Sequence, residues 1–241
     1  MQPQVEVRQA VILAAGLGTR MLPLTKAIPK ALLPLGMKPA IHRLVEECIS
    51  SGVDDIVIVV SAHSRVKDYF SRAQWLYEHI REKRDKQALR NLKALDRLKP
   101  LLRFVVQEPL LGEVHALSKA LPILKRAPFA VLFSDNLFRG RLPATLEAIR
   151  LFRRHGKHVK SNGRYVFHAS IMDSLKRLPY KSAYQDNPRG IDFVWVFDQL
   201  TEGQDYLETL ASGRRYNIGD AHAYFTAFPA FARDFKARKT E

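Results

Sequence analysis

A loop rich in glycine, proline and basic residues follows the first apolar run of this chain, and its residue types suit phosphate chemistry. Gly16 and Gly18 allow backbone conformations and close approaches that side chains would prevent. Several backbone N–H groups of such a loop can therefore point at one phosphate. Arg20, Lys26 and Lys30 add positive charge, and interspersed prolines restrict the backbone that carries them. The segment predicts a binding site for a polyphosphate.

Two common phosphate-binding loops do not fit this segment. A Rossmann dinucleotide loop would need a third glycine at position 21, which is Met21, and a helix that begins at once. A Walker loop would need Gly-Lys-Ser or Gly-Lys-Thr, which the sequence lacks. A turn with a purely structural role would not need paired basic residues between prolines. We therefore favour phosphate binding by a loop of a different kind.

Apolar runs that alternate with helical patterns predict the elements that position this loop. Buried strands are expected at residues 10–14, 56–60, 104–106 and 129–133, and helices at residues 41–49, 66–98, 113–124 and 143–155. Strands buried on both faces and separated by helices indicate an α/β fold, a Rossmann-like and mainly parallel sheet flanked by helices. Ligands bind beyond the carboxyl ends of such strands, where the loop and Ser134-Asp135-Asn136 both fall.

The last part of the chain is less regular. We expect a strand at residues 164–168, a short helix at 171–178 and a strand at 191–197 that buries Trp195. A terminal helix is expected at 220–238, broken or kinked by Pro229. Because no linker is evident, we expect one domain over residues 1–241.

The overall charge favours an anionic partner. The chain has 39 basic and 24 acidic residues, a net charge of +15, which suits nucleic acid, an acidic membrane surface or a phosphorylated small molecule. Nucleic acid is the weaker expectation, because no RNA-binding signature accompanies the basic runs. The longest apolar run, at residues 56–60, is too short to cross a membrane, and the single Cys48 cannot form an internal disulfide. These features favour a cytoplasmic protein without a membrane partner.

Several sequence segments resemble those of a known protein family. LAAGLGTRMLPLTKAIPKALLPL, at residues 13–35, resembles the signature of the sugar-phosphate nucleotidylyltransferases and looks closest to that of bacterial UTP–glucose-1-phosphate uridylyltransferases. QEPLLGEVHAL at 107–117 is similar to the family's base-binding segment, and SDNLFRG at 134–140 to its metal-aspartate segment. The helical stretch from residue 66, SNGRYVF at 161–167 and RRYNIGDAHAY at 214–224 also resemble family segments.

The resemblance implies a role for each matching residue. The nucleotide-binding set would be Leu13, Ala14, Ala15, Gly16, Leu17, Gly18, Thr19, Arg20, Lys30, Gln107 and Gly112. Arg20, on the triphosphate, and Lys30, on the phosphates that flank the reacting centre, would be the catalytic residues. Gln107 and the backbone at Gly112 would read the pyrimidine. Asp135 would hold Mg²⁺, the cofactor that the family implies.

The chain departs from the family in two places. The helix that ends near His155 leads through GKHVK directly into SNGRYVF, where relatives have a longer segment with a Glu-Lys-Pro motif that binds the sugar and its phosphate. Lys157 or Lys160 is a candidate replacement for the missing lysine. Asn217 stands where relatives have an aspartate as second metal ligand. Asp220 is an alternative ligand, or else the N-cap of a helix.

The activity implied is nucleotidyl transfer from a nucleoside triphosphate, UTP, to a sugar 1-phosphate, glucose 1-phosphate. The attacking phosphate oxygen is already anionic, so positioning and fixed positive charge are needed rather than a general base. Residues 8–156 would form the nucleotide-binding core, and residues 157–241 a reduced sugar-binding part with a C-terminal helix. A catalytically impaired paralogue that acts as a regulatory or partner subunit stays open as an alternative, and a homo-oligomer is a further expectation.

Overall fold

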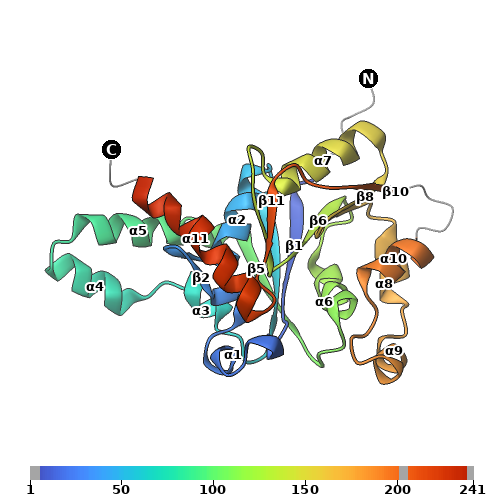
Figure 1. The fold of residues 1–241 in the computed structure, drawn as a ribbon, viewed down its shortest axis with the longest axis horizontal. Helices are drawn as coiled ribbons and strands as arrows, with labels where there is room; N and C mark the ends of the chain where they lie inside the picture. Colours follow the sequence, from blue (N-terminus) through green and yellow to red (C-terminus); the bar gives the residue numbers. More distant parts are fainter. Residues whose placement is uncertain (1–5, 201–205, 238–241) are drawn as a thin grey trace.

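The computed structural model describes residues 6–200 and 206–237, and a seven-stranded sheet lies at its centre (Figure 1). The strands follow the order β10 (Tyr206–Thr209), β8 (His158–Ser161), β9 (Arg164–Phe167), β6 (Phe129–Phe133), β1 (Gln9–Ala14), β4 (Asp55–Ser61) and β5 (Leu102–Gln107). Among the described strands of this sheet, β9 alone runs antiparallel to its neighbours. The predicted mainly parallel α/β fold is confirmed, and all four strands predicted in the first part of the chain are present.

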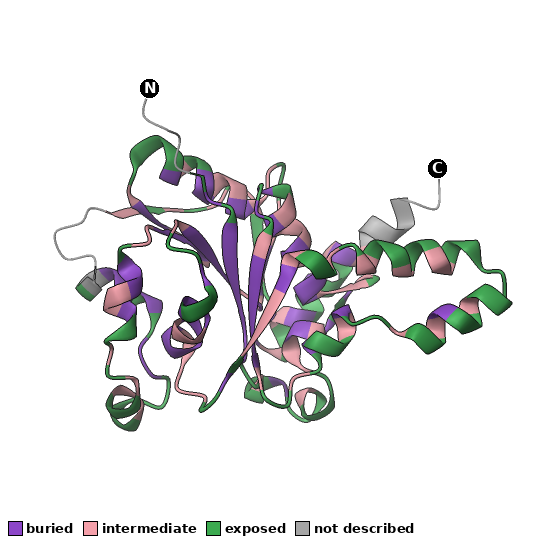
Figure 2. Cartoon of the chain, turned by 180° about the vertical axis from the view of Figure 1, so that it is seen from behind, coloured by how far each residue is buried: buried purple, intermediate pink, exposed green. Residues whose placement is uncertain are grey.

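Helices cover both faces of this sheet. One face is covered by α2 (Ala40–Ser50), α3 (Val66–Phe70), α7 (Ala144–His155) and α11 (Ala221–Ala237), and the other by α6 (Glu113–Ala120), α8 (Ile171–Lys176) and α10 (Phe193–Leu200). Side chains alternate along β1, so Ile12 packs in the first core and Val11 in the second. The central strands are consequently buried along their length, as Figure 2 shows in purple.

The strand order places a ligand-binding edge where the sequence analysis expected it. β1 pairs in parallel with β4 on one side and with β6 on the other. The chain therefore extends the sheet in one direction through β5 and then crosses to the opposite side of β1. Such a reversal opens a crevice beyond the carboxyl ends of the strands. The loop after β1 and the turn after β6 both emerge there.

The remaining elements surround this core. Two small antiparallel pairs are β2 (Pro34–Leu35) with β3 (Lys38–Pro39) and β7 (Asn136–Arg139) with β11 (Arg214–Asn217). The helices not yet named are α1 (Leu24–Ala27), α4 (Gln74–Glu82), α5 (Lys86–Asp96) and α9 (Tyr180–Asp186). The helical stretch predicted at residues 66–98 is thus three helices, of which α4 and α5 project beyond the sheet (Figure 1). No helix in the described ranges is long and apolar enough to cross a membrane.

The strand predicted at residues 191–197 is wrong. The segment enters α10 at Phe193, because Asp192 caps it by accepting hydrogen bonds from the backbone N–H of Trp195, through its carboxylate, and of Val196, through its carbonyl. Phe193, Val196 and Phe197 then share a buried face at helical spacing. Trp195, predicted to be in the core, is 39% exposed on the opposite side.

The predicted terminal helix is present, and of the break or kink predicted at Pro229 the break does not occur. The assigned helix α11 runs from Ala221 to Ala237 with Pro229 inside it. Tyr224, Ala227 and Phe231 bury one face of this helix in the core. This packing outweighs the one backbone hydrogen bond that a proline removes.

A β-hairpin follows α7 where the sequence analysis had placed one strand only. β8 and β9 pair antiparallel, with Ser161 opposite Arg164, so Asn162 and Gly163 form a two-residue turn. Their φ angles are +43° and +92°, as a type I′ hairpin turn requires. The hairpin carries Lys160 to the ligand-binding edge of the sheet.

Candidate functional site

The loop after β1 folds back on itself around Gly18. Gly18 has a φ of +67°, and a Cβ there would lie 2.9 Å from Thr25 Cγ2 and 3.3 Å from Lys30 Cβ. The Gly18 carbonyl accepts hydrogen bonds from the Met21 N–H at 2.9 Å and from the Thr25 hydroxyl at 2.8 Å. Glycine at this position therefore lets the basic end of the loop pack close to its beginning.

This packing brings Lys30 to the end of β6. Its Nζ lies 2.6 Å from Asp135 Oδ2, and the two side chains are only 12% and 18% exposed. Arg20 reaches the same place from the other direction. A Cβ on Gly219 would lie 2.8 Å from Arg20 Nη2, 2.7 Å from Asn217 Oδ1 and 3.5 Å from Asp135 Oδ2. Two of the three loop cations, Arg20 and Lys30, thus lie with the predicted metal ligand Asp135 at one edge of the sheet, whereas the exposed Lys26 lines neither hollow described below.

A hollow of about 320 Å³ opens beside this cluster. Its walls are Leu13, Ala15, Gly16, Leu17, Lys30, Gln107, Leu110, Gly112, Glu113, Ala116, Phe133, Ser134 and Asp135. Eight residues of the predicted site are among them. The other four residues predicted to bind nucleotide, Ala14, Gly18, Thr19 and Arg20, do not line this hollow. The side chain of Ala14 instead packs into the core on the opposite face of the sheet.

Gln107 is anchored in this hollow. Its Nε2 donates to the Gly112 carbonyl at 2.8 Å and lies 3.1 Å from His115 Nδ1, which leaves Oε1 without a partner in the described chain. Gly112 has a φ of +94°, and a Cβ there would lie 2.4 Å from the Arg189 carbonyl oxygen. Its backbone therefore approaches the 187–190 segment more closely than any side chain would permit.

A second hollow, of about 410 Å³, opens on the far side of Asp135. It is lined by Glu113, Phe133, Asp135, Asn136, Lys160, Asn162, Gly163, Tyr165, Glu208, Thr209, Leu210, Arg215 and Asn217. The two hollows share Glu113, Phe133 and Asp135. Lys160 Nζ lies 3.1 Å from Glu208 Oε1 inside the second hollow. Lys157, the other candidate for the missing lysine, is not among its lining residues.

β11 supplies the C-terminal wall of the site. The Ile218 N–H donates to the Asp135 carbonyl at 2.8 Å, and Asn217 Oδ1 accepts from the Gly219 N–H at 2.7 Å. Asp220 Oδ1 accepts from the Ala223 N–H at 2.9 Å, so Asp220 is the N-cap of α11. Asn217 lines the second hollow with Asp135, whereas Asp220 lines neither hollow.

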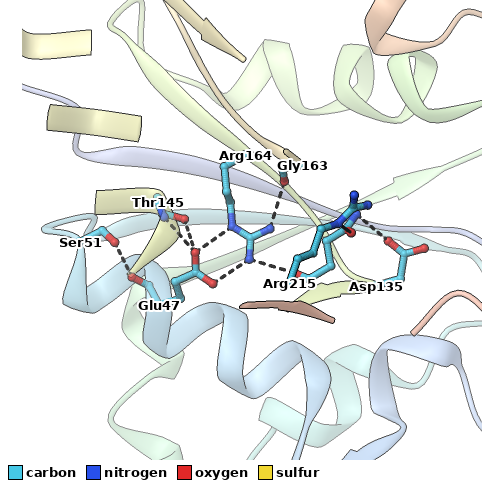
Figure 3. A network of polar contacts seen from close by, with 8 residues as sticks. Glu47, Ser51, Asp135, Thr145, Gly163, Arg164 and Arg215 are labelled. Atoms are coloured by element: carbon cyan, nitrogen blue, oxygen red, sulfur yellow. Dashed lines mark hydrogen bonds and ion pairs between the residues drawn. The ribbon is translucent and has the colours of Figure 1, made fainter. Parts of the chain in front are cut away.

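A buried ion pair holds the turn that carries Asp135 (Figure 3). Arg164 is fully buried, and its Nε and Nη2 donate to the two carboxylate oxygens of Glu47 at 2.8 and 2.7 Å. Arg164 Nη2 also donates to the Asn136 carbonyl at 2.9 Å, and Nη1 to the Gly163 carbonyl at 3.0 Å. Burial by itself raises the pKa of Glu47, but the pairing with Arg164 outweighs it and lowers that pKa.

The side chain of Asn136 connects this pair to both hollows. Its Nδ2 donates to Asp135 Oδ1 at 3.3 Å, and its Oδ1 accepts from Arg215 Nε at 2.7 Å. Arg215 Nη1 donates further to Asn162 Oδ1 at 2.8 Å. Sequence reasoning assigned no role to Glu47, Arg164 or Arg215, because pairing between residues this distant along the chain leaves no local pattern. The dipeptide Asn162-Gly163 was a local signal that could have predicted the hairpin.

Comparisons with known proteins identify the family of this chain. Residues 9–161 match the family described as nucleotidyl transferase. A UTP–glucose-1-phosphate uridylyltransferase of Bacillus subtilis is 38% identical over 155 residues, 64% of this chain and 52% of that protein. One from Staphylococcus haemolyticus is 30% identical over 247 residues, 95% of this chain and 85% of that protein.

Solved structures show the same fold. A UDP-glucose pyrophosphorylase from Acinetobacter baumannii aligns with a TM-score of 0.81 at 21% identity, over 98% of this chain and 99% of that one. A UDP-glucose pyrophosphorylase complexed with UDP-glucose aligns with a TM-score of 0.76 at 20% identity, over 95% of this chain and 100% of that one. The chain spans about half the length of the first curated relatives it matches. On the family match, which covers more than half of its residues, this chain belongs to the nucleotidyl transferase family.

Proposed function

We propose that this chain transfers a nucleotidyl group from UTP to glucose 1-phosphate and releases pyrophosphate. The observation that carries the proposal is the meeting of two hollows at Asp135, with Lys30 at that edge. Each hollow lies within the size range of small-molecule sites, roughly 300–1,000 Å³. A transferase that joins two phosphorylated substrates needs such adjoining sites.

The nucleotide fits the first hollow from base to phosphates. Gln107 Oε1 is open to accept a hydrogen bond from the base, and the Gly112 backbone lies beside it. Backbone of the 15–17 segment and Lys30 would hold the phosphates, with Arg20 near Gly219 outside the lining of the hollow. The roles of Arg20 and Lys30 as catalytic residues are part of this proposal.

The acceptor fits the second hollow. Lys160 offers an ammonium group for the sugar phosphate, and Glu208 offers a carboxylate for sugar hydroxyls. In the proposed reaction, an acceptor phosphate oxygen forms a bond to the α-phosphorus of the triphosphate. The bond from that phosphorus to the bridging oxygen breaks, and pyrophosphate leaves with the electron pair. Fixed cations offset the repulsion between the two anions.

The residues at Asp135 fit a Mg²⁺ ion that is shared with substrate. Asp135 supplies a carboxylate, and Asn217 beside it supplies an amide oxygen that already accepts from Gly219. In the described ranges no group of three or more histidine, cysteine or acidic side chains could hold a metal ion by itself. Mg²⁺ keeps several waters and binds through one or two carboxylates plus substrate phosphates, so this donor set suits it. When bound, the ion would neutralise phosphate charge.

The alternative is a paralogue that binds nucleotide without turnover and acts through a partner. Asn217 favours it, because an amide in place of a carboxylate weakens metal binding. The location in the cytoplasm and the homo-oligomer expected from the sequence stay predictions in either case.

Pyrophosphate release separates the two functions. The full chain is incubated with UTP, glucose 1-phosphate and Mg²⁺, and each component is omitted in turn. The proposal predicts release at more than about 1 s⁻¹, an ordinary enzyme rate, only when all are present. Saturable UTP binding without release would instead establish the silent paralogue.

A further inference from the structure

The wall between the two hollows carries one acid that the proposed reaction does not use. Glu113 is the first residue of α6 and lines both hollows. Its Oε1 accepts a hydrogen bond from the Phe193 N–H at 3.0 Å, which joins the beginnings of α6 and α10. Its Oε2 has no hydrogen-bond partner or cation among the described residues. A half-buried side chain that lines both hollows thus has one carboxylate oxygen without a partner in the described part of the chain.

The surroundings of Glu113 destabilise its carboxylate when no ligand donates a hydrogen bond to it. Burial raises its pKa to about 7, the Phe193 N–H opposes that rise, and the negative charges of Asp192 and Asp135 add to it. Lys30, the cation that lines the first hollow with Glu113, is paired with Asp135. A carboxylate in such a place gains most from a ligand that donates hydrogen bonds without adding negative charge.

Glu113 follows Gly112 directly in the chain and lines the first hollow together with Asp135, and these neighbours indicate the ligand. Gln107 and Gly112 lie where the base is expected, and Lys30 and Asp135 lie where the phosphates are expected. The part of a nucleotide between its base and its phosphates is the ribose. A ribose carries hydroxyl donors and no charge, so its chemistry matches the open Oε2.

We propose that Glu113 Oε2 accepts a hydrogen bond from the ribose diol of the bound nucleoside triphosphate, and so makes this chain selective for an intact ribose. This inference rests on the proposed nucleotide site. Glu113 acts as a specificity-determining residue at the junction of the two hollows, and takes no part in the bond changes at phosphorus.

Calorimetric titration with UTP, 2′-deoxyuridine triphosphate and 3′-deoxyuridine triphosphate, each with Mg²⁺, tests the inference on the full chain. A hydrogen bond to a charged group is worth about 1.5–3 kcal/mol, so at least one deoxynucleotide should bind roughly 10- to 100-fold more weakly than UTP. The nucleotide that loses affinity identifies the hydroxyl that Glu113 holds.

The variant Glu113→Gln separates this role from a structural one. Its amide oxygen still accepts from Phe193, but the carboxylate is gone, so the preference for UTP over the weaker deoxynucleotide should fall below about threefold. Asp192→Asn is the matched control: it removes a neighbouring negative charge outside both hollows and should keep the full preference.

Three results would overturn the inference. The first is equal binding of all three nucleotides by the wild type, and the second is an unchanged preference for UTP in Glu113→Gln. The third is an effect of Glu113→Gln that is confined to the KM for glucose 1-phosphate, which would assign Glu113 to the acceptor. If the wild type binds none of the nucleotides, the proposed function itself fails, and that outcome is distinct from the three above.

Discussion

The two hollows that meet at Asp135 are built in different ways. The first is lined by the loop after β1, the ends of β1, β5 and β6 and the start of α6. The second is lined by charged side chains from β8, β10 and β11, which come together only through the hairpin and the two strands that follow it. The proposed phosphate site is therefore encoded locally, while the proposed acceptor site depends on tertiary assembly.

The largest effect should come from breaking the buried ion pair that supports the turn between the two hollows. Arg164→Leu leaves Glu47 as an uncompensated buried charge and releases the Asn136 carbonyl. We expect a loss of about 3–5 kcal/mol in the free energy of unfolding, measured by urea denaturation. Arg126→Leu is the control, because it breaks an exposed pair with Asp173 and should change stability little. Equal effects of the two variants would rule out a structural role for the buried pair.

Removing the cation of the first hollow should affect turnover and leave the fold intact. Lys30→Ala deletes the ammonium group at Asp135, and we expect pyrophosphate release to fall about 10²- to 10³-fold. The control Lys67→Ala alters an exposed lysine on α3 and should keep wild-type rates. If Lys30→Ala retains activity within a few-fold of the wild type, its assigned role is wrong.

Glu113, at the junction of the two hollows, should make the free energy of unfolding depend on pH. The folded pKa of Glu113, about 7, lies above its ordinary value of 4.5, because the group is buried. The folded chain then binds more protons than the unfolded chain in this window, so unfolding free energy falls as pH rises from 4.5 to 7. Glu113→Gln should lack this loss and gain up to about 3 kcal/mol over the wild type by pH 7. The exposed Glu82→Gln is the control; a gain independent of pH in Glu113→Gln would contradict the account.

The smallest effect should come from a substitution of the lysine in the second hollow. Lys160→Ala removes one cation from a surface that also holds Arg215. We expect about a tenfold rise in the KM for glucose 1-phosphate, with the KM for UTP unchanged. Lys176→Ala, on the exposed side of α8, is the matched control. A rise in the KM for UTP instead would place Lys160 on the nucleotide.

The sequence predicted the first hollow well because its determinants are local. Glycines, prolines and basic residues follow one buried strand, and the parallel sheet brings that strand's end beside Asp135. The sequence-based prediction failed at α10, because an apolar run with Phe193, Val196 and Phe197 fits a strand as well as a helix. The hydrogen bond that caps the segment at Asp192 favours the helix. In the second hollow, Glu208 lies in no recognised motif, and Arg215 lies in a family-like segment without an assigned role. Only the pairing of β10 with β8 and of β11 with β7 brings these two side chains to the hollow.

The proposed transfer reaction and the proposed role of Glu113 both require that the chain binds a nucleotide. Calorimetric titration of UTP with Mg²⁺ into the full chain tests this binding most directly. We expect one site per chain with a Kd below about 1 mM, and a much weaker signal from Lys30→Ala. Absence of binding by UTP and by dTTP at millimolar concentration would contradict it.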